Sequence, residues 1–270
     1  MPATVSGMRS KARDLLVSKV QANSTDNESE YVQVAVHGKT LSDISPFEPA
    51  KFVETSNDDA AIVLLISDAT FNDLVYQAYV NKTFEFTINN DSQPRLLLVQ
   101  LECKPQDELC LGNVAPELAQ KFGSTSLVQM SFKALKAPEI EFIHDNATFT
   151  AAFTSELIIS PANDTKVFYH EATASIDVSG ILKIKIKQNI LYAKVDIEQV
   201  IIRIHEERNK KWEDKISGAI KQTIEEFING QSFFDGLPLS LPFGIIVDEP
   251  VIKFSPHTLQ VNIGFDRIRD

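Results

Sequence analysis

Histidine and acidic side chains are the residues of this sequence that could transfer protons or bind metal near neutral pH. The five histidines are scattered singly, at His37, His144, His170, His205 and His257. Two glutamates follow His205, but the second histidine of a zinc-protease helix is missing. The sequence also contains no Gly-x-Ser-x-Gly elbow, P-loop or dinucleotide fingerprint. These residues therefore predict no catalytic activity, no metal site and no cofactor.

The two cysteines, Cys103 and Cys110, lie in a polar, turn-prone segment that includes Pro105 and Asp107. A metal site would need further Cys or His ligands at short spacing, and none is nearby. A disulfide would close a small loop and stabilise the fold by about 2 kcal/mol. We expect the disulfide; the alternative is a pair of free thiols.

Asparagines that begin an Asn-x-Ser/Thr motif are potential N-glycosylation sites, and chance would give roughly two of them in this composition. The sequence has them at Asn23, Asn27, Asn81, Asn90, Asn146 and Asn163. The excess favours a secreted protein, although Asn, Ser and Thr also concentrate in turns, where the motif arises unselected. The first residues lack the basic flank and apolar stretch of a signal peptide. The chain is therefore either cytosolic or a mature or truncated product, and we expect a secreted protein whose signal peptide is not in this chain.

The net charge of −11 and the pI near 5.0 argue against nucleic-acid binding, which depends on clustered Lys and Arg. An anionic membrane surface is disfavoured for the same reason. The sequence has no run of about 18 apolar residues, so it predicts no membrane-spanning helix. The row Lys183, Lys185 and Lys187 is interpreted as the solvated face of a strand; the alternative is a contact with anionic lipid.

Alternating apolar and polar residues predict unusually long β-strands in the middle of the chain. The alternation holds over residues 167–187, several times the usual strand length of about five or six residues. Gln188-Asn189 forms the turn, and the apolar phase of the returning strand shifts at Glu198-Gln199, which indicates a β-bulge. Further strands are expected at residues 31–37, 61–66, 83–88, 95–101, 127–132, 139–143, 148–159, 245–247, 251–254 and 258–265.

Three segments have the spacing of amphipathic helices. The longest spans residues 212–228 and stops at Asn229-Gly230, a shorter one follows the cap Ser67-Asp68, and another covers residues 114–122. Their apolar stripes fit either a protein core or a ligand cradle. The adjacent Glu225 and Glu226 are interpreted as solvated. The pattern predicts an α+β fold, in which a long, strongly curved antiparallel sheet wraps around one long amphipathic helix plus short helices.

Three short motifs resemble those of a known family. They are Val-Leu-Leu-Ile-Ser-Asp-Ala-Thr-Phe-Asn at residues 63–72, the helix at residues 114–122, and the Leu-Pro-rich residues 236–242 with residues 250–254. Their order, over residues 31–266, resembles the C-terminal barrel of the bactericidal/permeability-increasing and lipopolysaccharide-binding protein family, within the tubular lipid-binding superfamily. The family's disulfide lies in the N-terminal barrel, so the pair of cysteines here has no counterpart that can be carried over. Strongly basic tips bind endotoxin in some members of the family, whereas this chain is acidic, so endotoxin recognition is not expected.

The resemblance implies a non-catalytic domain at residues 31–270 that binds a phospholipid-like lipid in an elongated apolar pocket. It implies a tandem N-terminal barrel, with residues 1–30 as its remnant or linker. It also implies transient contact with a membrane or lipoprotein surface, in extracellular lipid transport or innate-defence recognition. The residues expected to line the pocket come from the helix stripes: Phe71, Leu74, Val75, Tyr79, Leu118, Phe122, Ile216, Ile220, Ile224 and Phe227.

Two other functions fit the same residues. In the first, the barrel is filled by its own side chains and its outer surface binds a partner protein. In the second, the chain is an intracellular lipid-transfer domain with unused glycosylation motifs and reduced cysteines.

Overall fold

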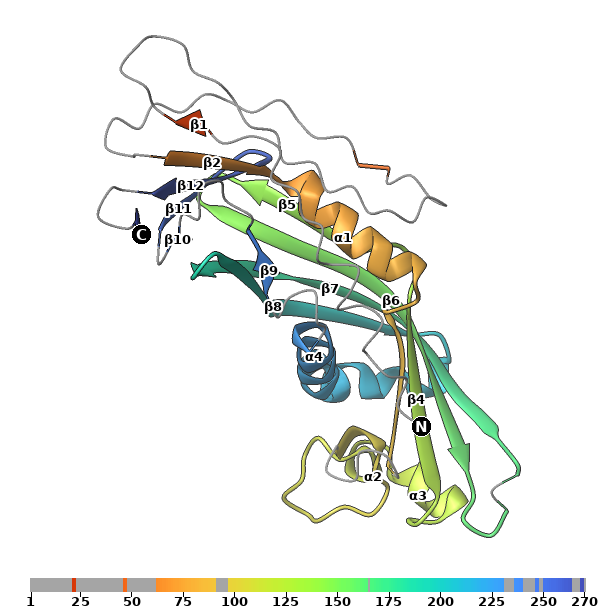
Figure 1. Ribbon diagram of the computed structural model, residues 1–270. Coiled ribbons are helices and arrows are strands. Elements are labelled where there is room, and N and C mark those ends of the chain that lie inside the picture. The colour runs from red at the N-terminus through yellow and green to blue at the C-terminus, as the bar shows by residue number, and fades with distance from the viewer. Residues whose placement is uncertain are drawn as a thin grey trace.

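Antiparallel sheets and a few helices make up the described part of the chain (Figure 1). The computed structural model describes residues 62–90, 97–164, 166–230, 236–239, 246–247 and 250–263, together with residues 21–22, 46–47 and 268–269. The predicted α+β class with a long antiparallel sheet is confirmed, and the described strands form open sheets rather than a closed barrel. The strand expected at residues 31–37 and the expected remnant at residues 1–30, apart from residues 21–22, lie outside the described residues.

The main sheet contains the long strands and is antiparallel throughout. Its order is β3-β4-β6-β7-β8-β9, and β5 pairs with β6 beside β4. The strands are β3 (Glu85–Asn89), β4 (Leu127–Ala134), β5 (Glu139–Ile143), β6 (Asn146–Ser160), β7 (Tyr169–Lys187), β8 (Ile190–Ile204) and β9 (Leu237–Pro238). With 19 residues, β7 confirms the length that the alternation predicts.

The turn and the bulge between β7 and β8 lie where the sequence places them. Gln188 and Asn189 both have positive φ, at 50° and 59°, which suits a tight hairpin between right-twisted strands. Ser179 pairs with Gln199 and Gly180 with Ile197, so Glu198 is the extra residue of the bulge. A Cβ on Gly180 would lie 2.3 Å from the carbonyl oxygen of Asp196, and only glycine fits there.

A smaller sheet lies at the other end of the molecule from α3 (Figure 1). Its order is β1-β2-β12-β11, and two further short strands pair with each other nearby. The bounds are β1 (Gln21–Ala22), β2 (Ile62–Ser67), β11 (Val251–Ser255) and β12 (Thr258–Ile263), with β10 (Ile246–Val247) paired to β13 (Ile268–Arg269).

The helices agree with the sequence except around residues 95–122. They are α1 (Asp68–Val80), α2 (Leu111–Val114), α3 (Pro116–Phe122), α4 (Glu213–Asn229) and the 3₁₀ helices η3 (Leu97–Val99) and η4 (Glu207–Trp212). The strand expected at residues 95–101 is wrong, because its short apolar run forms η3 with Leu98 and Val99 in the core. The helix expected at residues 114–122 is interrupted, since Pro116 starts a new helix.

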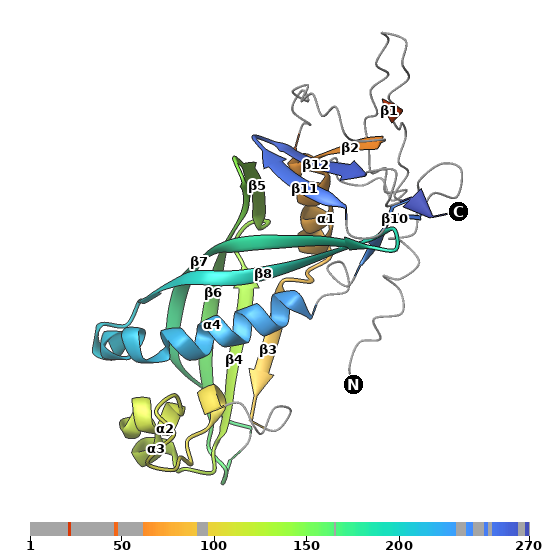
Figure 2. The ribbon, with the colours of Figure 1, turned by 90° about the vertical axis from the view of Figure 1, so that its left-hand side faces the viewer.

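The core lies on one face of the main sheet, the face that α4 covers (Figure 2). Along β6, Phe149, Ala151 and Phe153 are buried, whereas Thr150 on the opposite face is exposed. The stripe of α4 meets this apolar face, and Ile216, Ile220, Ile224 and Ile228 are all buried. The alternation along the strands thus places the long helix inside the curve of the sheet.

The free edge of β5 is sealed by side chains of α1. The Asn72 side-chain amide donates to the carbonyl oxygen of Ile140 at 2.7 Å, and the Ile140 amide donates back to Asn72 Oδ1 at 2.7 Å. The Phe142 amide donates to Asp68 Oδ2 at 3.4 Å, and the His257 amide donates to the Phe142 carbonyl oxygen at 2.9 Å. Side chains and a turn thus take the place of a neighbouring strand.

The edge of β8 is sealed in the same way by α4, beyond the short pairing with β9. Asn229 exchanges two hydrogen bonds of 2.8 Å with the backbone of Val195. The Ile197 amide donates to Glu225 Oε2 at 3.1 Å, and the Ile204 amide donates to Glu213 Oε1 at 2.6 Å. The interpretation of Glu225 as a solvated residue is therefore wrong, because an edge strand lies within its reach.

Replacing Asn72 by alanine tests the sealed edge of β5. The change leaves the amide and carbonyl of Ile140 unpaired in a buried place, so Asn72→Ala should lower the free energy of unfolding by about 3 kcal/mol. Urea denaturation measures this loss. Asn81→Ala, at the exposed end of the same helix, is the matched control and should cost less than about 1 kcal/mol. Equal losses in the two variants would contradict the sealing role of Asn72.

Candidate functional site

The expected lining residues of α4 all face the main sheet. Ile216, Ile220 and Ile224 are buried against it. Phe227 is half-buried, and its ring stacks on Phe86 with centroids 3.6 Å apart. Phe86 stacks in turn on Phe132 of the next strand, at 4.7 Å. The helix thus ends on a column of three aromatic rings.

The expected lining residues of α1 form a separate group next to β5. Phe71 and Val75 are buried, and the Phe71 ring packs edge-on against Phe142 at 5.3 Å. Leu74 and Tyr79 are half-buried, and the Tyr79 hydroxyl donates to the carbonyl oxygen of Leu135 at 3.3 Å. This group lies where β4 gives way to β5.

The two residues from α3 form a third group near the start of β7. Leu118 is buried, whereas Phe122 is half-buried with its ring 5.1 Å from that of Tyr169. The ten expected lining residues therefore lie in three groups, which the contiguous apolar core joins. Four of them, Leu74, Tyr79, Phe122 and Phe227, keep part of their surface accessible.

A hollow of about 240 Å³ lies on the opposite face of the main sheet, close to the bulge. It includes none of the ten expected residues, and its lining is mostly apolar. Ile201 and Ala152 contribute side chains there, and Lys136 and Asp177 lie at its border, where Arg203 pairs with Asp177 at 2.5 Å. The sequence alone did not predict this hollow. The sequence feature nearest to it is the shift in the apolar alternation at residues 198–199, because Gln199 lines the hollow.

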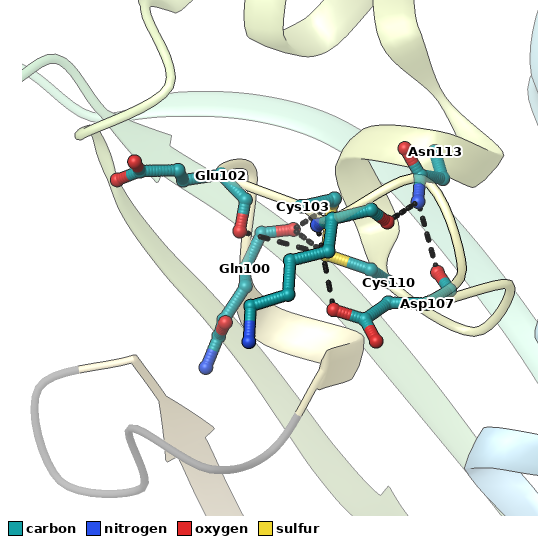
Figure 3. Close-up of a disulfide and its surroundings, with 7 residues drawn as sticks. Gln100, Glu102, Cys103, Asp107, Cys110 and Asn113 are labelled. Atoms are coloured by element: carbon teal, nitrogen blue, oxygen red, sulfur yellow. Dashed lines mark hydrogen bonds between the residues drawn. A yellow bond between two sulfur atoms is a disulfide. The ribbon is translucent and has the colours of Figure 1, made fainter.

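The predicted disulfide is present, and it holds the loop between η3 and α2 (Figure 3). Cys103 is bonded to Cys110, and the side-chain amide of Asn113 donates to the carbonyl oxygens of Lys104 at 2.8 Å and Asp107 at 3.0 Å. Leu109 in this loop lies beside Gly218 of α4. The disulfide loop thus lies next to the long helix.

Glu117 and Glu171 tie the short helices to η4 by ion pairs. Lys211 pairs with Glu117 at 2.7 Å, and the Trp212 indole donates to the same carboxylate at 3.2 Å. Burial raises the pKa of Glu117, but the hydrogen bond from Lys211 and the charge of that lysine outweigh it and hold the pKa below its usual range. The buried Glu171 carboxylate forms ion pairs with Lys121 at 2.6 Å and with Arg208 at 3.5 Å.

The potential glycosylation sites differ in accessibility. The structure exposes Asn81 and Asn163, and Asn146 is half-buried. Asn90 has both ends of its side-chain amide engaged, because it donates to the Ser126 carbonyl oxygen at 3.0 Å and accepts from the Val128 amide at 3.2 Å. Asn23 and Asn27 lie outside the described residues.

The remaining expectations concern charge, metal and membrane. Lys183 is largely exposed and pairs with Asp196, which raises the pKa of Lys183 and lowers that of Asp196. Among the residues that the structure describes, no three His, Cys, Asp or Glu side chains are grouped as metal ligands. In the same residues, no helix is both long and apolar enough to cross a bilayer.

The joint change Cys103→Ser and Cys110→Ser should lower the free energy of unfolding by about 2 kcal/mol, because the open loop gains conformational entropy when unfolded. Urea denaturation with and without reductant measures it. Reductant should bring the unchanged protein to the stability of the variant and leave the variant unaffected. A variant as stable as the oxidised protein would contradict this role of the disulfide.

Stability should also depend on Glu117 at acid pH. A carboxylate whose pKa is lowered by folding stabilises the protein above its unfolded pKa, and this contribution is lost as pH falls through the folded value. We expect Glu117→Gln to flatten the fall of unfolding free energy below about pH 4.3. Thermal unfolding from pH 7 to pH 3 measures this. Glu108→Gln, which removes an exposed carboxylate without an ion pair in the described structure, is the control and should keep the original profile.

Comparison with known proteins shows which family this chain matches. The family described as "LBP / BPI / CETP family, C-terminal domain" matches residues 28–266. No curated protein matches the chain. The crystal structure of lipopolysaccharide binding protein is similar with a TM-score of 0.46 and 10% identity, over 79% of this chain and 45% of that chain. P47 of Clostridium botulinum E1 gives a TM-score of 0.28 and 13% identity, over 94% and 61%.

The present chain thus spans less than half the length of the first of these structures. The resemblance that the motifs indicate is confirmed by the family match, which extends over most of the sequence. The chain belongs to the LBP/BPI/CETP family of lipid-binding proteins and corresponds to the C-terminal domain of that family.

Proposed function

We propose that this domain binds a phospholipid-like lipid without catalysis, by burying acyl chains between the curved sheet and its helices. The observation that carries the proposal is the apolar inner face of the main sheet, covered by helix stripes instead of a second sheet. Acyl chains gain about 0.8 kcal/mol for each CH₂ group removed from water. In this proposal, burial of the acyl chains in an elongated apolar interior is therefore the driving force for lipid binding.

The half-buried residues are the best candidates to contact the ligand. Leu74, Tyr79, Phe122 and Phe227 retain surface that an acyl chain would cover, whereas the other six expected lining residues are buried in the core. The edge contacts of α1 and α4 are polar and lie to the side of their apolar stripes. An acyl chain can thus lie along a stripe while the helix stays bound to its strand.

The proposal also covers the full-length protein, its secretion and its role outside the cell. The chain covers 45% of the length of lipopolysaccharide binding protein, which fits a tandem N-terminal barrel in the full protein. The disulfide and the exposed Asn81 and Asn163 support a secreted glycoprotein. We infer a role in extracellular lipid transport or defence-type recognition, with transient contact with a membrane or lipoprotein surface and no cofactor.

The alternative is a protein-interaction module with a self-filled interior. It is favoured by the burial of Phe71, Val75, Leu118 and the three isoleucines of α4, which contact protein atoms over almost their whole surface. In that case the outer face of the sheet, with its hollow near Ile201, would bind the partner.

Native mass spectrometry and lipid extraction of protein from a eukaryotic secretory host test the proposal. We expect a co-purified lipid of defined mass, and uptake of a fluorescent phospholipid by the delipidated protein. Phe227→Ser should reduce this uptake, whereas Leu135→Ser, an exposed apolar residue, should leave it unchanged. An empty protein that takes up no lipid would support the interaction module.

The same material tests secretion. Glycosidase treatment should lower the intact mass, and thiol labelling should find no free cysteine. Unmodified asparagines together with reduced cysteines would support the intracellular lipid-transfer domain instead.

A further inference from the structure

Three consecutive apolar side chains are exposed at the turn between β6 and β7. Val167 is 37% exposed, Phe168 64% and Tyr169 42%. Figures 1 and 2 both place this turn and α3 at one end of the molecule, with β11 and β12 at the opposite end. We name Phe122, Val167, Phe168 and Tyr169 the hairpin tip. Contiguous apolar surface of this kind marks a contact with a partner or a membrane.

The hairpin tip is an ordered feature of the fold. The Ser160 hydroxyl donates to the Val167 carbonyl oxygen at 2.7 Å, and the Val167 amide donates to the Asp164 carbonyl oxygen at 3.2 Å. These bonds fix the turn just before Phe168. On its other side, the Tyr169 ring packs on Phe122 of α3 at 5.1 Å. The backbone therefore presents the Phe168 side chain outward from a supported base.

The charges around the hairpin tip differ from those of the whole chain. Lys121 Nζ lies 4.4 Å from the centre of the Phe122 ring and is held there by Glu171 at 2.6 Å. Arg208 pairs with the same carboxylate at 3.5 Å, and Lys166 is exposed in the turn beside Val167. Cationic side chains thus lie beside the apolar tip of a chain whose net charge is −11, and there they can approach phosphate groups.

We propose that the hairpin tip docks on a phosphatidylcholine-type bilayer surface, where Val167 and Phe168 enter the interface and Lys121 and Lys166 lie among the phosphates. Aromatic rings favour the boundary between head groups and acyl chains, and lysine side chains extend from it toward water. The inference rests on the proposed function, because a domain that exchanges phospholipid with a bilayer has to reach its surface.

Vesicle flotation with phosphatidylcholine measures the docking, on protein made without glycans because the motif at Asn163 lies in the same turn. Phe168→Ser should weaken binding about tenfold, since the variant no longer buries an aromatic side chain. Leu135→Ser is the matched control, because Leu135 is 57% exposed and lies in another part of the molecule. Equal binding by both variants overturns the proposal, and so does binding that requires anionic lipid or vanishes in high salt.

Tryptophan fluorescence gives a second measurement that does not depend on weakened binding. The only tryptophan, Trp212, is 2% exposed and serves as a constant background. In Phe168→Trp, vesicles should shift the emission to the blue, and brominated phosphatidylcholine should quench the added signal. The proposal is overturned if vesicles neither shift nor quench the added signal. It is also overturned if the hairpin tip binds a partner protein and no vesicle.

A short-chain phospholipid below its micelle concentration separates this proposal from the proposed function. The unchanged protein and Phe168→Ser should bind it equally, because no surface is involved. If the unchanged protein does not bind it, the proposed function fails. If it binds the monomer and Phe168→Ser binds vesicles as tightly as the unchanged protein does, only the docking proposal fails.

Discussion

Satisfying the unpaired backbone groups at the edges of the main sheet is the requirement on which the rest of the structure depends. An open sheet leaves a row of amide and carbonyl groups at each edge, and these must find partners or invite other strands. Here Asn72 and Asp68 of α1 fill this role along β5, and Asn229, Glu225 and Glu213 of α4 fill it along β8. Each helix is thereby fixed beside the sheet with its apolar stripe turned inward.

Local periodicity made much of this fold predictable. The alternation over residues 167–187, the turn at Gln188-Asn189, the bulge at Glu198 and the stripe of α4 are all patterns between near neighbours, and the structure contains each of them. The short apolar run at residues 95–101 has no such period, and a buried 3₁₀ turn suits it as well as a strand.

Contacts between distant segments were not predictable in the same way. Asn72 and Ile140 are 68 residues apart, and nothing in either neighbourhood identifies the other as its partner. The motif at residues 63–72 carries the family resemblance, and the structure supplies the physical reason for its Asp and Asn. Likewise, the stripes identified apolar residues of the helices, but their division into buried and half-buried members depends on the packing.

The contact between Asp68 and His257 has a consequence for the order of folding. The two side chains meet at 2.8 Å although 189 residues separate them, and β2 pairs with β12 beside them. During synthesis, β2 and the start of α1 must therefore wait for residues 258–263 before their pairing is complete. Long-range pairing of this kind slows folding and leaves apolar strands uncovered in the meantime. A nascent chain of this protein thus leaves the apolar strand β2 without its neighbour until residues 258–263 have been synthesised.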